Sequence, residues 1–126
     1  MRAVDTNVVV RIVTRDDEKQ TAAADAFIAR GAWVSQIVLM ETAWLLRAVY
    51  RLGHPEIATV LEMLLNHQSL TLQDPDVVAA ALVHYQRRPS LGFSDCLVLE
   101  IAKKAGHLPL GTFDRDLSKI EGTERL

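Results

Sequence analysis

The chain has 126 residues, of which 49% are hydrophobic and 24% charged, a composition that favours one folded domain over residues 1–126 and excludes a disordered chain. The formal net charge of −2 excludes a broad basic field for non-specific DNA binding and leaves local basic patches open. A single cysteine, Cys96, excludes an internal disulfide. Because the sequence has neither a long apolar run nor a signal-peptide pattern, we expect a cytoplasmic protein with no membrane contact.

The first predicted elements are a short buried strand and two helices. Residues 2–5 (RAVD) are too few for a helix and favour a strand that ends at Asp5. Because Asp5, Thr6 and Asn7 are all residue types that cap helices, we place a short helix directly after this strand. A second helix is predicted in residues 16–31, which begin with acids and end in a glycine.

The middle of the chain alternates between strand and helix patterns. We expect helices that close at Gly53, that start near Pro55, and that stop before Pro89. The segments in chain order are a strand at 32–36, helices at 37–53 and 54–68, a strand at 69–74 and a helix at 75–89.

The last predicted elements are a helix at 93–106, a strand at 108–113 and a short helical turn at 114–120. Strands separated by helices pair in parallel through right-handed crossovers. We therefore predict an α/β fold in which one parallel sheet carries helices on both faces. Ligands of such sheets bind beyond the carboxyl ends of the strands.

Several carboxylates occupy unexpected positions relative to these elements. Asp5 ends the first strand, and Asp114 and Asp116 follow the last one. Glu41 lies within an apolar helix, and Asp95 begins another. Taken singly, the aspartates fit helix caps or exposed first-turn acids, and Glu41 fits the wet face of its helix. If the first and last strands belong to one sheet, however, their acids emerge at the same edge.

A cluster of such acids indicates a cation site. Two carboxylates ~4 Å apart repel each other by roughly 4 kcal/mol at an effective dielectric constant near 20. With no cysteine or histidine pattern nearby, the oxygen ligands favour Mg²⁺, or Mn²⁺ as a substitute, and not zinc. An acidic cluster with such a metal is typical of phosphodiester hydrolysis.

Four motifs in order resemble the PIN-domain ribonucleases, and more narrowly the VapC-type toxins of bacterial toxin–antitoxin pairs. These are "AVDTN", the glutamate within its apolar helix, "FSDCLVLEIA" and "LGTFDRDLSKI". The resemblance implies an α/β/α fold, an acidic Mg²⁺ site, and endonucleolytic cleavage of RNA that inhibits translation and growth.

The resemblance also implies roles for individual residues. The metal-binding and catalytic acids would be Asp5, Glu41, Asp95 and Asp114, with Asp116 as an alternative or additional ligand. The polar residues that orient them would be Thr6, Asn7, Ser94 and Thr112. The cations nearest these motifs, expected to contact RNA phosphates, are Arg11, Arg15 and Arg115.

The family further implies a homodimer and a cognate antitoxin protein as partners. The apolar residues of two central helices exceed what one small domain needs to bury, and the remainder would form the dimer face and a groove for an antitoxin helix. Two other classes of protein share parts of this pattern. A catalytically inactive PIN-like binding module would have no reason to keep every acid. A receiver or phosphatase domain would carry paired acids after its first strand, where this chain has one.

Overall fold

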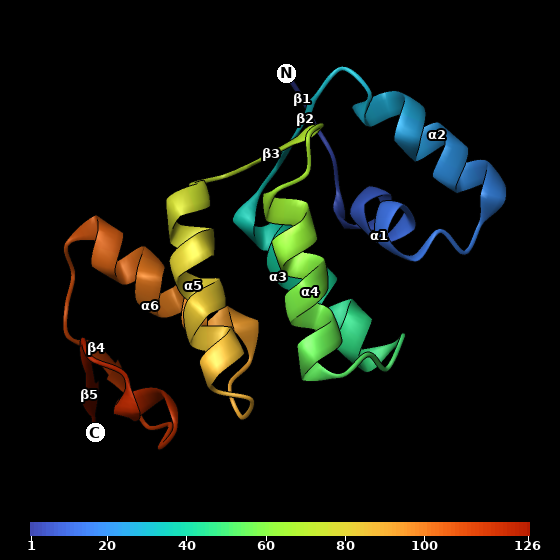
Figure 1. Ribbon diagram of the computed structural model, residues 1–126. Helices are drawn as coiled ribbons and strands as arrows, with labels where there is room; N and C mark the ends of the chain where they lie inside the picture. Colours follow the sequence, from blue (N-terminus) through green and yellow to red (C-terminus); the bar gives the residue numbers. More distant parts are fainter. The chain divides into compact units, whose positions relative to one another are not determined.

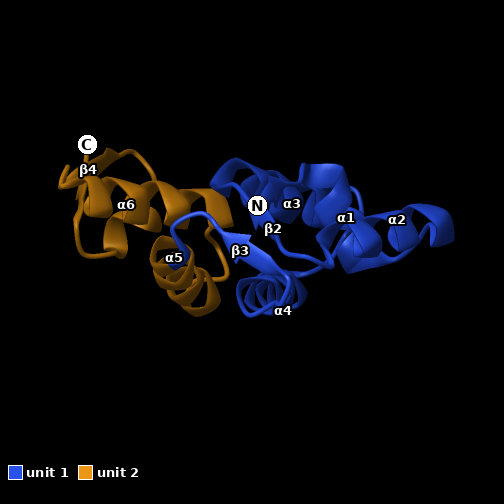
Figure 2. Cartoon of the chain, turned by 90° about the horizontal axis from the view of Figure 1, so that it is seen from above, with its two compact units in different colours: residues 1–75 blue, residues 76–126 orange.

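The computed structural model describes residues 1–126 and divides into two compact units (Figure 2). Unit 1 spans residues 1–75 and unit 2 spans residues 76–126. The predicted α/β class is confirmed, because six α-helices, in consecutive pairs, separate short strands and every strand pair is parallel. None of the helices combines the length and the apolar character that crossing a membrane requires.

The sheet of unit 1 has three parallel strands in chain order. They are β1 (Arg2–Ala3), β2 (Ala32–Val34) and β3 (Leu70–Leu72). In β2, Ala32 and Val34 are buried whereas Trp33 between them is exposed, as the alternation of side chains in a strand requires. The same pattern in β3 shows that one face of this sheet packs against the core of the unit.

Four helices complete unit 1, and three of them begin at a side chain that caps the first turn. The caps are Asp5, Asp17 and Ser35, each of which accepts a hydrogen bond from a backbone N–H three residues later. Helix α1 packs against α2 and α3, and α3 lies beside α4 (Figure 1). The helices are α1 (Thr6–Thr14), α2 (Glu18–Ile28), α3 (Gln36–Ala48) and α4 (His54–Leu65).

The helix predicted for residues 37–53 ends earlier than expected. Helix α3 stops at Ala48, and Gly53 is the N-cap residue of α4. Arg51 takes a left-handed conformation with φ of 56°, and the Leu52 N–H donates to the Leu46 carbonyl. This turn reverses the chain before the glycine is reached, so the glycine starts one helix instead of ending another.

Unit 2 begins with two helices that were predicted closely. They are α5 (Pro75–Arg87) and α6 (Phe93–Ala105). The rings of Tyr85 and Phe93 meet edge to face with centroids 5.8 Å apart, and Cys96 is buried. Helix α6 ends at Gly106, whose φ of 83° is readily adopted by glycine.

The expected single sheet is wrong in one respect. Strand β4 (Leu110–Thr112) pairs in parallel with β5 (Thr123–Arg125), a strand that the sequence did not predict, in a separate two-stranded sheet. A 3₁₀ turn, η1 (Leu117–Lys119), connects the two strands. Backbone hydrogen bonds make the pairing, and "TER" carries no apolar alternation that would have revealed it.

Candidate functional site

Asp5 lies where the sequence predicted, between β1 and α1. The Val4 N–H extends the ladder by donating to the Trp33 carbonyl at 3.1 Å, so the chain leaves the sheet at Asp5. One carboxylate oxygen of Asp5 accepts from the Val8 N–H at 3.2 Å, and the side chain is exposed. Asp5 therefore caps α1 through one oxygen and presents the other to solvent.

A cleft of about 550 Å³ opens beside Asp5, between α1 and α2. Its walls combine a carboxylate, two carboxamides, a guanidinium and several apolar side chains, including Asp5, Asn7, Arg11, Gln20, Val8 and Phe27. Volumes of this size are typical of small-ligand sites. The sequence pattern placed Asp5 and Asn7 here, but it gave no signal for the residues that α2 contributes.

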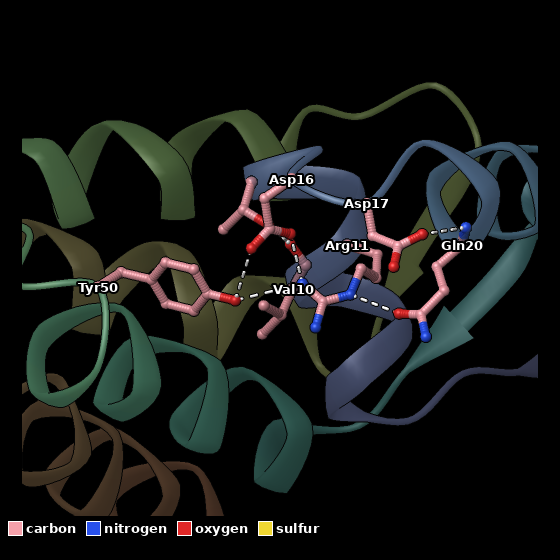
Figure 3. A network of polar contacts seen from close by, with 7 residues as sticks. Val10, Arg11, Asp16, Asp17, Gln20 and Tyr50 are labelled. Carbon is pink, nitrogen blue, oxygen red and sulfur yellow. Dashed lines mark hydrogen bonds and ion pairs between the residues drawn. The ribbon is translucent and has the colours of Figure 1, made fainter.

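Arg11 lies at the centre of a polar network beside this cleft (Figure 3). Its Nε donates to Oε1 of Gln20 at 2.7 Å, and its Nη1 donates to Asp16 and to the Tyr50 hydroxyl. The Tyr50 bond, helped by Asp16, raises the pKa of Arg11 above its ordinary value, so the cation persists at any working pH. The predicted phosphate-binding Arg11 is thus already ion-paired.

Glu41 is exposed on α3, as the interpretation of a wet helix face anticipated. Its neighbours on the same helix surface are apolar and also exposed: Ile37 at 65%, Met40 at 38% and Trp44 at 65%. The apolar side chains of α4 that seemed to be in excess, Ile57, Leu61 and Leu64, are instead fully buried. The apolar surface of this region is therefore concentrated around Glu41.

Asp95 and Asp114 influence each other in unit 2. Partial burial in the first turn of α6 raises the pKa of the Asp95 carboxyl, and the negative charge of Asp114 raises it further. Ser94 precedes Asp95 in the same turn and is half-buried. The structure thus brings together two of the predicted acids, in an environment that disfavours a second negative charge.

A tight turn after β4 holds Asp114. The backbone N–H of Asp114 donates to Oγ1 of Thr112 at 3.0 Å, and its own Oδ1 accepts from the Leu117 N–H at 2.8 Å. Asp116 instead lies 3.6 Å from Nζ of Lys119. Of the two acids in "TFDRD", Asp114 is therefore fixed next to Asp95, and Asp116 has a cationic partner of its own.

The fit of a divalent metal can be judged from these donors. Within either unit, no group of three or more histidine, cysteine, aspartate or glutamate side chains is close enough to hold an ion. Magnesium, however, is commonly held by one or two carboxylates and keeps several water ligands. The Asp95–Asp114 pair has this chemistry, because a divalent cation would relieve the repulsion that raises the pKa of Asp95.

A second cleft, in unit 2, was not predicted from the sequence. It has a volume of about 350 Å³, and its lining includes three cationic side chains together with the acidic Glu121. Arg87 ends α5, Arg88 follows it, and neither makes an ion pair. Lys119 comes from η1 and lies 3.6 Å from Asp116. The adjacent arginines were visible in the sequence, but the lysine joins them only through the fold.

The other predicted cations differ in their pairing. Arg15 forms two hydrogen bonds with Asp25, at 2.6 and 3.2 Å, which neutralise its charge locally. Arg115 is exposed next to Asp114 and forms no ion pair. Arg115 and the two arginines of this cleft are therefore unpaired cations of unit 2.

A comparison with protein families matches the PIN domain model to residues 2–122, which include residues from both units. No curated protein and no solved structure gave a match in the corresponding searches. PIN domains are generally nucleases that use divalent metals, in agreement with the acids described above. Because the match covers nearly the whole sequence, this chain belongs to the PIN-domain family.

Proposed function

We propose that this protein is a Mg²⁺-dependent endoribonuclease and the toxin of a VapC-type toxin–antitoxin pair, with residues 1–126 acting as one PIN domain. The observation that carries the proposal is the coupling of Asp95 and Asp114, which burial and repulsion make receptive to a divalent cation. The family match supports a nuclease. The presence of an acid at each position that the resemblance names supports an active one.

Within unit 2, Asp95 and Asp114 would hold the metal. The family resemblance names Asp5 as a further ligand, and one of its carboxylate oxygens is not used to cap α1. A bound Mg²⁺ would polarise the scissile phosphate and neutralise the charge that develops on its oxygens. Thr112 and the Leu117 N–H keep Asp114 in its orientation. We assign to Glu41 the acceptance of a proton from the attacking water. The water oxygen would bond to phosphorus, the bond from phosphorus to the leaving ribose oxygen would break, and that oxygen would take a proton from solvent.

The RNA backbone would be held by the accessible cations, Arg115 and the arginines of the unit 2 cleft. Each phosphate contact on a single strand contributes about 0.7 to the slope of log K against log salt concentration. We therefore expect the double variant R87Q/R88Q to lower this slope by up to about 1.4. An unchanged slope would remove these residues from the RNA-binding surface.

The exposed apolar residues around Glu41 support the proposal of protein partners. Ile37 and Trp44 are each 65% exposed on one helix, which is unusual for large apolar side chains in a protein without partners. We propose that a second copy of the chain and an antitoxin use surfaces of this kind. An antitoxin arginine could also inhibit by pairing with the acids.

The decisive experiment is cleavage of purified RNA with Mg²⁺, with Mn²⁺ and with EDTA. We expect cleavage only with a divalent metal, and a loss of at least 100-fold in D5N, D95N and D114N, as is common when a metal ligand is removed. The matched control is D116N, which leaves the proposed ligands intact and should retain most activity.

The alternative function, a catalytically inactive binding module, makes the opposite prediction. Brief expression of such a module would arrest growth without new RNA ends, and D5N would arrest growth equally well. Metal-independent cleavage that survives D95N would also refute the proposal. New 5′ ends that require both Asp5 and Asp95 would support it.

A further inference from the structure

We infer that the cleft between α1 and α2 binds one unstacked nucleobase of a single-stranded RNA, and that the Gln20 carboxamide reads the edge of this base. The inference rests on the proposed ribonuclease function, because that function supplies the RNA. It assigns a role in RNA recognition to helix α2, which contains none of the predicted catalytic or metal-binding acids.

The first step is the orientation of the Gln20 side chain. Its Oε1 accepts from Nε of Arg11 at 2.7 Å, which directs the two N–H donors of its amide away from the guanidinium. Arg11 cannot turn freely, because its Nη1 is held by Asp16 and by the Tyr50 hydroxyl at 3.2 Å (Figure 3). The network therefore fixes the Gln20 amide as a donor at the wall of the cleft.

Asp16, which holds the Arg11 guanidinium, is itself fixed by two further hydrogen bonds. Asp16 accepts from Oγ1 of Thr14 at 2.8 Å and from the Tyr50 hydroxyl at 3.3 Å. The Thr14 bond and the charge of Arg11 lower the pKa of Asp16, so this carboxylate stays ionised well below neutral pH. Arg11 is accordingly a positioning residue that acts through Gln20.

The second step is the chemistry of the cleft, which suits a base better than a phosphate. Its ionised groups are the Asp5 carboxylate, which repels an anion, and a guanidinium already paired with Asp16. The carboxamides of Asn7 and Gln20 provide donors and acceptors, which match the mixed edge of a nucleobase.

The third step is the apolar wall. Phe27 and Val8 line the cleft, where they can cover the flat surface of a base. The Arg2 guanidinium lies 3.8 Å from the centre of the Phe27 ring and donates to the Phe27 carbonyl at 3.2 Å. The wall is thus held in place, as a site that selects among bases needs.

The inference is tested by RNA binding in EDTA, where no cleavage occurs. Anisotropy measures the affinity for labelled octamers of A, of C, of U, and of alternating G and U. We expect wild type to discriminate among them, and Q20A to weaken binding of the preferred octamer three- to tenfold while changing the poorest one less than twofold. The matched control is Q68A, an exposed glutamine outside the cleft, which should bind as wild type does.

R11K provides the test of positioning. A lysine cannot hold Asp16 and Gln20 at once, so R11K should lose discrimination, and R11K/Q20A should lose no more than either single variant. Equal loss on every octamer in Q20A, or wild-type binding that ignores the base, would overturn the inference.

The two proposals fail separately in this design. Base discrimination that depends on Gln20, without any RNA cleavage in Mg²⁺, would refute the ribonuclease and retain the base site. Metal-dependent RNA cleavage, together with base discrimination that Q20A does not change, would refute the base site and retain the ribonuclease.

Discussion

His84 and Glu100 form a pair between α5 and α6 that can be removed one side chain at a time. Nε2 of His84 lies 3.1 Å from Oε2 of Glu100, and the two side chains are 25% and 8% exposed. The variant H84A leaves the Glu100 carboxylate buried without its imidazole partner. Leaving a buried acceptor unpaired costs about 1–3 kcal/mol, and more when the acceptor is charged. Because water reaches a quarter of the His84 side chain, we expect a loss of about 1–2 kcal/mol in the free energy of unfolding.

The assay is urea unfolding at pH 7, followed by circular dichroism. Tryptophan fluorescence would report unit 1 alone, because Trp33 and Trp44 both lie there. In the E100Q background the buried charge is absent, so H84A should cost about 0.5 kcal/mol or less. The matched control is H107A, which removes an exposed histidine of the same unit and should stay within about 0.5 kcal/mol of wild type. A loss below that value in H84A, or an equal loss in both backgrounds, would refute the reasoning.

Four further predictions follow, three of them tested by the same unfolding measurement and one by thiol labelling. The raised pKa of Asp95 means that the ionised form of this carboxyl opposes folding. We therefore expect D95N to raise the free energy of unfolding at pH 7 in the absence of metal. This gain should vanish as the pH falls below the ordinary carboxyl pKa near ~4. The opposite sign is expected for D76N, because the hydrogen bond and ion pair with Lys104 lower the pKa of Asp76 and contribute stability that is lost as the pH falls through that lowered pKa. Burial raises the pKa of Cys96 to about 12, so an aromatic disulfide reagent at pH 8 should label the thiol only after urea is added; labelling of the native protein would contradict this burial. G106A should lower the free energy of unfolding by about 1 kcal/mol through backbone strain alone, since an added Cβ meets no atom within 4 Å; an unchanged midpoint would show that the strain is relieved.

The order of helices and strands was predictable because it depends on local chemistry. Capping side chains such as Asp5 and Asp17 satisfy N–H groups three residues away, and Pro89 prevents continuation of α5, so short sequence windows hold this information. The end of α3 was missed because a non-glycine residue, Arg51, takes the left-handed conformation usually reserved for glycine. Strand β5 was missed because its pairing comes from the backbone.

The candidate site was predictable to a similar extent. The positions of Asp95 and Asp114 followed from their places beside predicted elements, and the structure adds their mutual repulsion. The cleft between α1 and α2 was not predictable, because Gln20 and Tyr50 acquire their roles only when Arg11 joins segments that are distant in sequence. Gln20 and Tyr50 lie nine and 39 residues from Arg11 in the sequence, and such separations produce no helix or strand periodicity that would reveal the contacts.

The pairing of β4 with β5 has a practical consequence for handling the protein. The Leu126 N–H donates to the Thr112 carbonyl at 2.9 Å, and the Leu126 side chain lies 3.5 Å from the position of a Cβ added to Gly111. Asp114 follows two residues after β4. Loss of residues 123–126 would therefore remove the partner of the strand that leads to a proposed metal ligand. A preparation that has lost activity in this way would still contain every acid of the site.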